Sequence, residues 1–459
     1  MQYQCKMGMV PVVPAPLFSG VFLMNNNLDQ FRDKQSDAGP AGDRPGGISG
    51  WSRRAFVSFK SPVYRLYYLS MVGHWSSMNM QMFARNLLVW YITGSGAILG
   101  VLSLSNAIPM ILFTLPGGVL ADRLQKKNVI QVAQVFSVLI SLGTTLAIVF
   151  DYLSPAHPES WWVLALSGIL QGVVMGIMTP SRAAIISEIV PPQHLMNAIS
   201  LNNMGMNIFR IISPALAGVL VDVLGFWVVY AIMTFMIITS VFFIWLVPPT
   251  SSPAKTTGVS NSLQDVVEGW KYIRGQKTIF AILLFTAIGM ILGAPYSQLL
   301  PMFADPSILN ISATTLGLLM MVSGIGAIIG SLILASLTDR RRGLILISAV
   351  LMMSVTLIGF SFSPWLAMSL SFIFFIGMGS TVQMALGNSL IQYYVDAAYR
   401  GRVLSFFMLC FGLSSLGSFF AGIMAEGIGV QWAVGSLAML LILVTLLVFA
   451  FVPRIRKLD

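Results

Sequence analysis

The chain has 459 residues, of which 56% are hydrophobic and 9% are charged. Soluble domains carry about 25% charged residues, so this composition excludes a soluble globular protein and predicts a polytopic membrane protein. The formal net charge is +10, but the placement of the cations favours membrane orientation over nucleic-acid binding. Cys5, Cys410 and three scattered histidines suggest no disulfide framework, no metal site and no cofactor.

The first region, residues 1–60, is rich in Gly, Pro, Asn and Asp from Asn25 onward. The apolar run Met9–Met24 is interrupted by prolines and lacks a small-residue cleavage site, which disfavours a signal peptide. Two interpretations remain open. Residues 1–60 form a disordered cytoplasmic tail, or translation begins at Met24.

Twelve hydrophobic runs follow, and each is long enough to cross a bilayer as a helix. A polar linker at residues 248–275 separates six runs from six. The predicted fold class is therefore an all-α polytopic membrane protein with two six-helix bundles, at 61–247 and 276–452, and a short cytoplasmic tail at 453–459. The predicted spans are 66–93, 97–121, 129–150, 161–179, 199–222, 224–247, 276–303, 313–337, 343–362, 364–387, 402–427 and 429–452.

The charges predict how the chain is oriented. Of 26 Lys and Arg residues, only Arg85 and Arg210 lie well inside predicted spans; the others lie in or beside the tails, the linker and the even-numbered loops. The odd-numbered loops contain no Lys or Arg, and at or near them lie Asp151, Glu159, Asp222, Asp305 and Glu426. By the positive-inside rule, both termini and the linker are cytoplasmic in a cell-membrane protein.

Two charged hinges indicate an internal duplication. The first, at residues 117–130, carries one acid and three cations, and a related hinge follows about 217 residues later at residues 337–343. Charges at this density cannot lie in hydrocarbon, so each hinge lies in water at a membrane face. The segments before spans five and eleven, at 189–200 and 394–405, repeat with an offset of 205 residues. Two parallel six-span halves place a cavity between them near the midplane, open alternately to each side.

The first hinge contains the pattern Gly118-x-Leu120-x-Asp122-Arg123-x-x-Lys126-Lys127. This pattern resembles the signature loop between the second and third spans of the major facilitator superfamily, with Gln125 where a second glycine is usual. Ser213–Gly218 is similar to the proline-glycine motif of span five in the superfamily's antiporters, with Ser213 and Ala217 in place of glycines.

The run Arg182–Gly218 resembles the branch that contains enterobactin exporters and macrolide-efflux proteins. The resemblance covers residues 60–452 and leaves the substrate open. Many drug/proton antiporters carry an arginine in span four, three residues before Gln171, where this chain has Gly168. Proton coupling through such an arginine is therefore not expected here.

The resemblance implies that the hinge latches the outward-open state from the inside. This role fits the chemistry, because a carboxylate can bind the positive N-terminal end of a neighbouring helix and the cations can meet acids or lipid phosphates. The alternative is that these charges only fix topology. The predicted gating residues are Gly118, Asp122, Arg123, Lys126, Lys127, Asp339 and Arg340.

Two polar faces predict a cavity. His74, Gln81 and Arg85 share one face of the first span, and Asn207 and Arg210 share a face of the fifth. An arginine at the bilayer centre costs roughly 2.5–3.5 kcal/mol on insertion scales, so each face should meet a cavity or a partner helix. No acid lies near the middle of any predicted span, which leaves carbonyl groups, water or an anionic substrate as partners.

The equal alternative is helix packing, with Arg85 extending outward to the membrane surface. The resemblance adds polar residues of spans four, seven and ten, which line the cavity in the superfamily. The predicted cavity residues are His74, Gln81, Arg85, Gln171, Asn207, Arg210, Tyr296, Gln298 and Gln383.

The leading hypothesis is a secondary transporter that works as a monomer and exports small amphipathic or anionic organic molecules, siderophore-like or drug-like, by alternating access. An importer, or a receptor or scaffold that no longer transports, is the alternative. The chain offers no nucleophile–base pair or carboxylate dyad for an enzyme and no Gly-x4-Gly-Lys-Ser/Thr loop for a nucleotide-driven pump. A proton is one candidate coupling ion, with His74 either titrating or serving as a hydrogen-bonding fixture.

Overall fold

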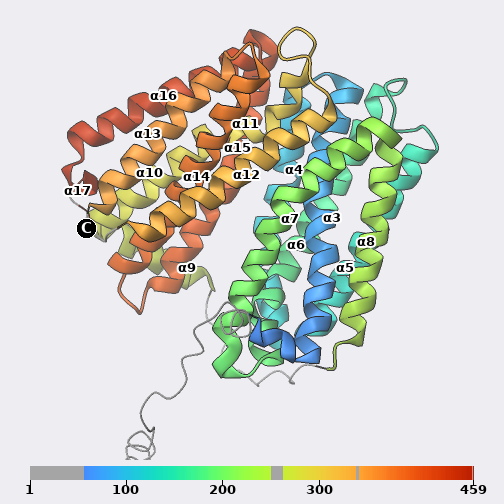
Figure 1. Cartoon of the computed structure of the whole chain (residues 1–459). Helices are drawn as coiled ribbons and strands as arrows, with labels where there is room; N and C mark the ends of the chain where they lie inside the picture. Colours follow the sequence, from blue (N-terminus) through green and yellow to red (C-terminus); the bar gives the residue numbers. More distant parts are fainter. Residues whose placement is uncertain (1–55, 250–261, 338–340, 457, 459) are drawn as a thin grey trace, which may run out of the picture. The chain divides into compact units, whose positions relative to one another are not determined.

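The computed structural model describes residues 56–249, 262–337, 341–456 and 458, in which every regular element is a helix (Figure 1). The tail predicted for residues 1–60 lies outside this part up to Ala55, and ordered structure begins before the predicted boundary, at η1 (Val57–Lys60). The first half contains α3 (Pro62–Thr93), α4 (Gly96–Arg123), α5 (Lys126–Val149), η2 (Pro158–Ser160), α6 (Trp161–Ile189), η3 (Pro192–His194), α7 (Leu195–Leu224) and α8 (Phe226–Leu246).

A linker helix, α9 (Ser262–Gly275), precedes the second half, where the sequence had predicted only a polar linker. The second half contains α10 (Lys277–Gly293), α11 (Pro295–Leu299), η4 (Leu300–Ala304), α12 (Ala313–Ser336), α13 (Arg342–Ser361), α14 (Leu366–Tyr394), α15 (Arg400–Ile428), α16 (Val430–Phe451) and α17 (Pro453–Arg456).

Eleven of the described helical segments are long and apolar enough to cross a membrane, judged by length and composition. Helix α3 is not among them because its polar stripe lowers its hydropathy, although its 32 residues exceed the roughly 20 that a bilayer requires. Protein covers that stripe: His74 and Ser77 are each 2% exposed and Arg85 is 8% exposed. We therefore count α3 as the twelfth spanning helix, because its polar groups do not face lipid.

Local sequence explains where several helices begin and end. The hydroxyl groups of Ser61, Ser95 and Ser312 cap α3, α4 and α12 by accepting a hydrogen bond from the backbone three residues later. Gly225 and Gly429 end α7 and α15 with φ of 84° and 82°, a backbone conformation that favours glycine.

Three spans depart most from their predicted bounds. Helix α6 continues to Ile189, ten residues past the predicted end, and α14 continues to Tyr394. The seventh span is broken into α10, α11 and η4, because Pro295 has no N–H to continue the hydrogen-bond ladder. The extension of α6 places Arg182 inside a helix, whereas the hydropathy pattern predicts a loop at this position.

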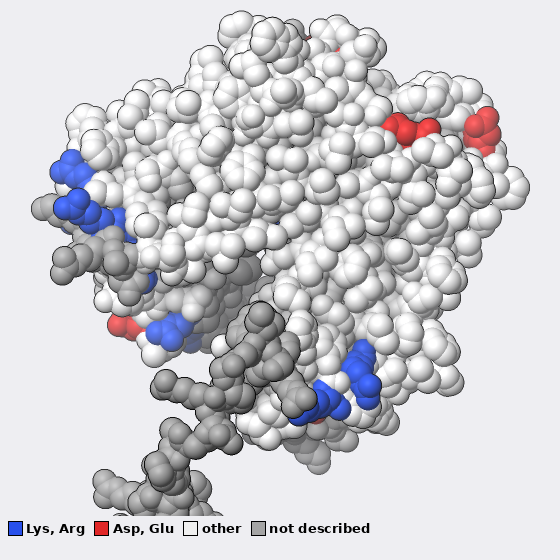
Figure 2. Space-filling model, viewed as in Figure 1, with Lys and Arg blue, Asp and Glu red and all other residues white. Residues whose placement is uncertain are grey.

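Charge divides the molecule into two ends (Figure 2). We call the end that carries Asp151, Glu159, Asp222, Asp305 and Glu426 the acidic end, and the opposite end, with the signature hinge, the basic end. On the face shown in Figure 2, Lys and Arg gather at the lower and left edge, and two acidic patches lie at the upper right. The two halves contact each other through α7 with α12 and through α4 with α15.

Each half carries a similar clamp at the basic end. In the first half, the Ser58 hydroxyl donates to Asn197 Oδ1 at 2.7 Å, which joins η1 to the start of α7. In the second half, Arg402 at the start of α15 bonds Glu268 of α9 at 2.6 Å. Asn197 and Arg402 are related by the 205-residue offset of the sequence repeat, so equivalent positions of α7 and α15 hold the segment that precedes each bundle.

Candidate transport cavity and its gates

A cavity of about 220 Å³ lies between α7 and the second half. Its only lining residue from the first half is Arg210 of α7, and three predicted cavity residues, Arg210, Tyr296 and Gln383, meet there. The wall also includes the helix break at Gly293–Ser297. The remaining lining residues are Gly289, Met290, Met353, Ser380, Thr381, Met384, Phe411 and Ser414.

The cavity combines a single cation with a wall of methionine, aromatic, hydroxyl and amide side chains. Arg210 is exposed, and no acidic residue lines the cavity. The Tyr296 hydroxyl lies 3.4 Å from the Ser323 hydroxyl, and Gln383 Nε2 donates to the Thr286 carbonyl at 3.4 Å. Methionine side chains adjust to ligands of different shape, and a guanidinium offers a planar fork of donors to an anion.

Four other predicted cavity residues lie inside the first half instead. His74, Gln81, Arg85 and Gln171 are at most 9% exposed, and none of them lines the cavity. Gln171 Nε2 donates to the Ser137 hydroxyl at 3.4 Å.

Arg85 explains the glycine that departs from the antiporter pattern. A Cβ atom at Gly168 would lie 3.0 Å from Arg85 Nη1 and 2.6 Å from the Ser105 hydroxyl. The guanidinium of α3 therefore occupies the space beside Gly168, and a larger residue on α6 would displace it. A cation therefore lies beside span four, but it belongs to α3 and not to α6 itself.

The last two predicted cavity residues lie on other surfaces. Asn207 is exposed on α7 and donates to the Asn203 carbonyl at 3.0 Å. Gln298 accepts a hydrogen bond from Asn86 of α3 at 2.5 Å, which joins the two halves.

Arg182 is a half-buried cation that the sequence pattern does not single out as a site residue. Its backbone carbonyl accepts from the Tyr67 hydroxyl at 3.4 Å, and its Nε has no hydrogen-bond partner among the described residues. It lies close enough to His74 for their charges to interact. The signal was present, because Arg182 belongs to the run that carries the family resemblance, but the segment Thr179–Arg182 looked like a loop.

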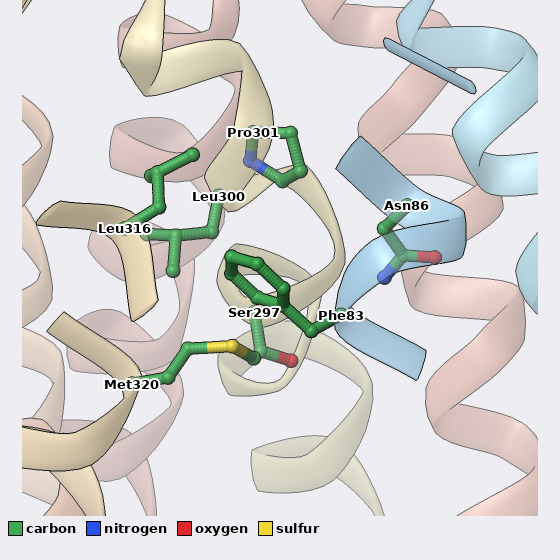
Figure 3. A pocket seen from close by; sticks show the side chains of 7 residues that line it. All are labelled: Phe83, Asn86, Ser297, Leu300, Pro301, Leu316 and Met320. Carbon is green, nitrogen blue, oxygen red and sulfur yellow. The ribbon is translucent and has the colours of Figure 1, made fainter. Parts of the chain in front are cut away.

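The acidic side of the cavity is closed by a plug (Figure 3). Phe83 of α3 points between Ser297, Leu300 and Met320 of the second half, and it is 5% exposed. The space left around this side chain is about 10 Å³, which holds no more than about one water molecule.

Glycines bring the backbones of the two halves into contact on the same side. A Cβ atom at Gly422 of α15 would lie 2.2 Å from the Gly96 carbonyl of α4, and one at Gly218 of α7 would lie 2.3 Å from the Ala313 carbonyl of α12. Neither position accepts a side chain without moving one half. Every hydrogen bond between the halves among the described residues lies toward this end.

The basic end contrasts with this arrangement. The helices that meet at the acidic end expose apolar side chains here, with Met196 of α7 75% exposed, Leu332 of α12 63% and Met408 of α15 55%. Since Arg210 is exposed and the acidic side is closed, the cavity is accessible from the basic end.

The predicted gating residues lie at this open end. Lys126 forms an ion pair with Glu188 of α6, and Lys127 Nζ donates to the Trp245 carbonyl of α8 at 2.8 Å. Asp122 and Arg123 are exposed. In the described part of the chain, no hydrogen bond or ion pair links this hinge to the second half. Gly118 has open space around it, and Asp339 and Arg340 lie outside the described residues.

Comparison with known proteins assigns the chain to a family. The model of the "transmembrane secretion effector" family matches residues 53–459. The chain belongs to this family. It is a branch of the major facilitator superfamily, which confirms the resemblance, the fold class and the transporter assignment made from sequence.

Its relatives are named as transporters, in agreement with the prediction that this chain is not an enzyme. Macrolide efflux protein A of Streptococcus pyogenes is 26% identical over 391 residues, covering 81% of this chain and 92% of that protein. The staphyloferrin A transporter of Staphylococcus aureus is 26% identical over 371 residues, covering 79% and 89%. The enterobactin exporter EntS of Escherichia coli O1:K1 is 24% identical over 293 residues, covering 62% and 67%.

Solved structures share the fold. A bacterial homolog of the human lysosomal transporter Spinster, in an inward-facing and occupied conformation, superposes with a TM-score of 0.67 at 14% identity, covering 90% of this chain and 99% of that one. The nucleoside transporter NupG superposes with a TM-score of 0.67 at 15% identity, covering 85% and 99%. These likenesses show that the chain has the fold of these transporters.

Proposed function

We propose that this protein is a secondary transporter that exports small amphipathic or anionic organic molecules across the cell membrane by alternating access. The observation that carries the proposal is the acid-free cavity in which Arg210 faces methionine and aromatic side chains. The exposed guanidinium of Arg210 offers a planar fork of donors to an anion, and the methionine and aromatic side chains of the wall accommodate the body of an amphipathic molecule. The names of the relatives, a macrolide efflux protein and two siderophore transporters, support this range of cargo.

Transport by purified protein in liposomes tests this function. The panel contains a carboxylate siderophore, a catecholate siderophore, a macrolide and a neutral solute of similar size. Arg210→Gln should weaken binding of an anionic cargo about tenfold or more, since a hydrogen bond to a charged group contributes about 1.5–3 kcal/mol. Arg210→Lys should recover part of the loss, because an ammonium lacks the planar fork.

The matched control is Arg85→Gln, which removes a guanidinium that does not line the cavity. It should leave affinity for the anion within about threefold of wild type, on the scale where tenfold is about 1.4 kcal/mol. Lowered thermal stability of Arg210→Gln with unchanged affinity would contradict a role in cargo binding. Absence of flux for every compound would favour a receptor or scaffold.

We further propose that the basic end is cytoplasmic, together with both termini and the linker. The charge distribution supports this orientation through the positive-inside rule, and the cavity would then open to the cytoplasm, where an exporter loads its cargo. Reporters fused after Asp151 or Asp305 should be extracytoplasmic, and one placed within residues 250–265 should be cytoplasmic. An extracytoplasmic reporter at 250–265 would contradict the topology.

Monomeric function and coupling to a proton complete the proposal. Two halves of one chain enclose the cavity, so a single chain can carry out the cycle. His74, buried beside Arg182, is the candidate proton site. Uphill flux that persists after the proton gradient is dissipated would exclude the proton as the coupling ion. Flux that stays proportional to protein at one chain per liposome would support the monomer.

A further inference from the structure

Two carboxylates cross between the halves at the acidic end. Asp222, near the end of α7, accepts hydrogen bonds from the backbone N–H groups of Ala313 and Thr314, at 3.2 and 2.7 Å, where α12 begins. Asp222 therefore caps the first turn of a helix in the other half.

Glu426 makes the reciprocal contact. It lies near the end of α15 and accepts hydrogen bonds from the Ala97 backbone N–H at 3.2 Å and from the Ser95 hydroxyl, where α4 begins. Asp222 fastens the first half to the second, and Glu426 fastens the second half to the first.

The two caps occupy equivalent positions in the sequence repeat. Each carboxylate lies three residues before the positive-φ glycine that ends its helix, Gly225 or Gly429. Each also lies four residues after the glycine that allows close backbone contact, Gly218 or Gly422.

The groups that the carboxylates contact are equivalent as well. Ser95 and Ser312 are both N-cap residues, and they are separated by the same 217 residues as the two charged hinges. The pair of carboxylate caps is thus duplicated together with the fold, and the pseudo-twofold axis between the halves relates one cap to the other. An incidental surface contact would not follow this symmetry.

We propose that Asp222 and Glu426 are gating residues that hold the acidic end closed and release it when the transporter opens to that side. A negative charge at a helix N-terminus satisfies free backbone N–H groups and interacts favourably with the helix dipole. Both interactions exist only while the halves touch, so they stabilise this state and not the opposite one. The proposal rests on alternating access but not on any particular cargo.

Distances between spin labels test the proposal without a substrate. Trp227 and Trp432, which are 54% and 57% exposed on α8 and α16, report the acidic end when changed to Cys and labelled. Met196 and Gly401, both exposed, report the basic end. The background carries Cys5→Ser and Cys410→Ala, and the protein is reconstituted in liposomes.

Losing one cap should shift the ratio of open to closed acidic ends about fivefold toward open, because a cap is typically worth about a factor of five. Asp222→Ala and Glu426→Ala should each show this shift, and the double variant about twenty-fivefold if the caps act independently. The basic-end distance should shorten in step. Asp222→Asn should shift the ratio of open to closed acidic ends less than Asp222→Ala does, since an amide oxygen still caps a helix.

Glu159→Ala and Asp305→Ala are the matched controls. Both residues are acids at the same end, but Glu159 pairs with His157 and Asp305 bonds Ser307 within its own loop. The controls should leave both distances unchanged. Wild-type distances in the folded double variant, or equal shifts in the controls, would overturn the proposal; if the double variant does not fold, the single variants decide it. Because no cargo is present, failure of the export hypothesis cannot produce either result.

Discussion

At the acidic end, α4 meets α15 and α7 meets α12 through close backbone contacts at glycines. Phe83 of α3 plugs the same end, and hydrogen bonds join the two halves there. At the basic end, the same four helices expose apolar side chains, and the described bonds remain within one half. Both ends are products of the same duplication. The difference shows that in this conformation the two halves are joined by hydrogen bonds at one end only.

The chemistry of the two ends also differs. The acidic end holds carboxylates against helix N-termini, with no cation among the crossing partners. The basic end keeps Asp122 and Arg123 exposed on the signature hinge. If the hinge latches the opposite state, as the resemblance implies, the two latches use the same carboxylate chemistry at opposite ends and never act together.

The largest expected effect comes from removing the plug. Phe83→Ala deletes a buried aromatic side chain that fills the contact between the halves, and such a change costs about 3–5 kcal/mol in well-packed cores. The thermal unfolding midpoint in detergent should fall clearly. Phe235→Ala, at a 65% exposed position, should change it little. Equal midpoints for the two variants would show that the plug does not stabilise this end.

A smaller loss is expected from a single methyl group at the backbone contact. The Gly422→Ala side chain would lie 2.2 Å from the Gly96 carbonyl, and overpacking of this kind costs about 1–3 kcal/mol. Spin-label distances should shift toward an open acidic end. Gly427→Ala, on the same helix with nothing within 4 Å, is the control and should behave as wild type. A closed acidic end in Gly422→Ala would disprove the close contact.

Next comes the basic end, where Asp122→Asn removes the charge of the signature hinge. Because Asp122 makes no bond across the halves in this state, its loss should leave thermal stability near wild type. Export should nevertheless fall several-fold, since a charge at a helix end is worth about 0.3–1 kcal/mol to the opposite state. Flux and protein level measured in the same vesicles check this. Unchanged flux would mean that the charges of the hinge only fix the topology of the chain.

The smallest effects concern the two clamps within the halves. Glu268→Gln removes an ion pair whose acid is 57% exposed, and exposed pairs contribute at most about 1 kcal/mol. Ser58→Ala removes a hydrogen bond from a 1% exposed hydroxyl, typically worth about 1 kcal/mol. Thermal midpoints should rank Ser58→Ala below Glu268→Gln. The reverse order would mean that the ionic clamp of the second half is the stronger one.

Much of the fold could be predicted because hydropathy and charge act locally. A run of about 20 apolar residues must form a spanning helix to satisfy its own backbone hydrogen bonds, whatever lies elsewhere in the chain. The same locality misled the prediction at α6, where the polar residues after Thr179 predicted a loop although the helix continues to Ile189. It also concealed the break at Pro295, because proline is tolerated in many membrane helices.

The candidate site divides in the same way. The sequence alone shows which side chains are polar within spans, and three of these, Arg210, Tyr296 and Gln383, line one cavity. It could not assign Arg85 and His74 to the interior of the first half, because both faces of a packed helix are removed from lipid and look alike in the sequence. Only the tertiary structure brought Asp222 to Thr314 and Glu426 to Ala97, since hydrogen bonds between segments far apart in the chain depend on the distance between two folded halves.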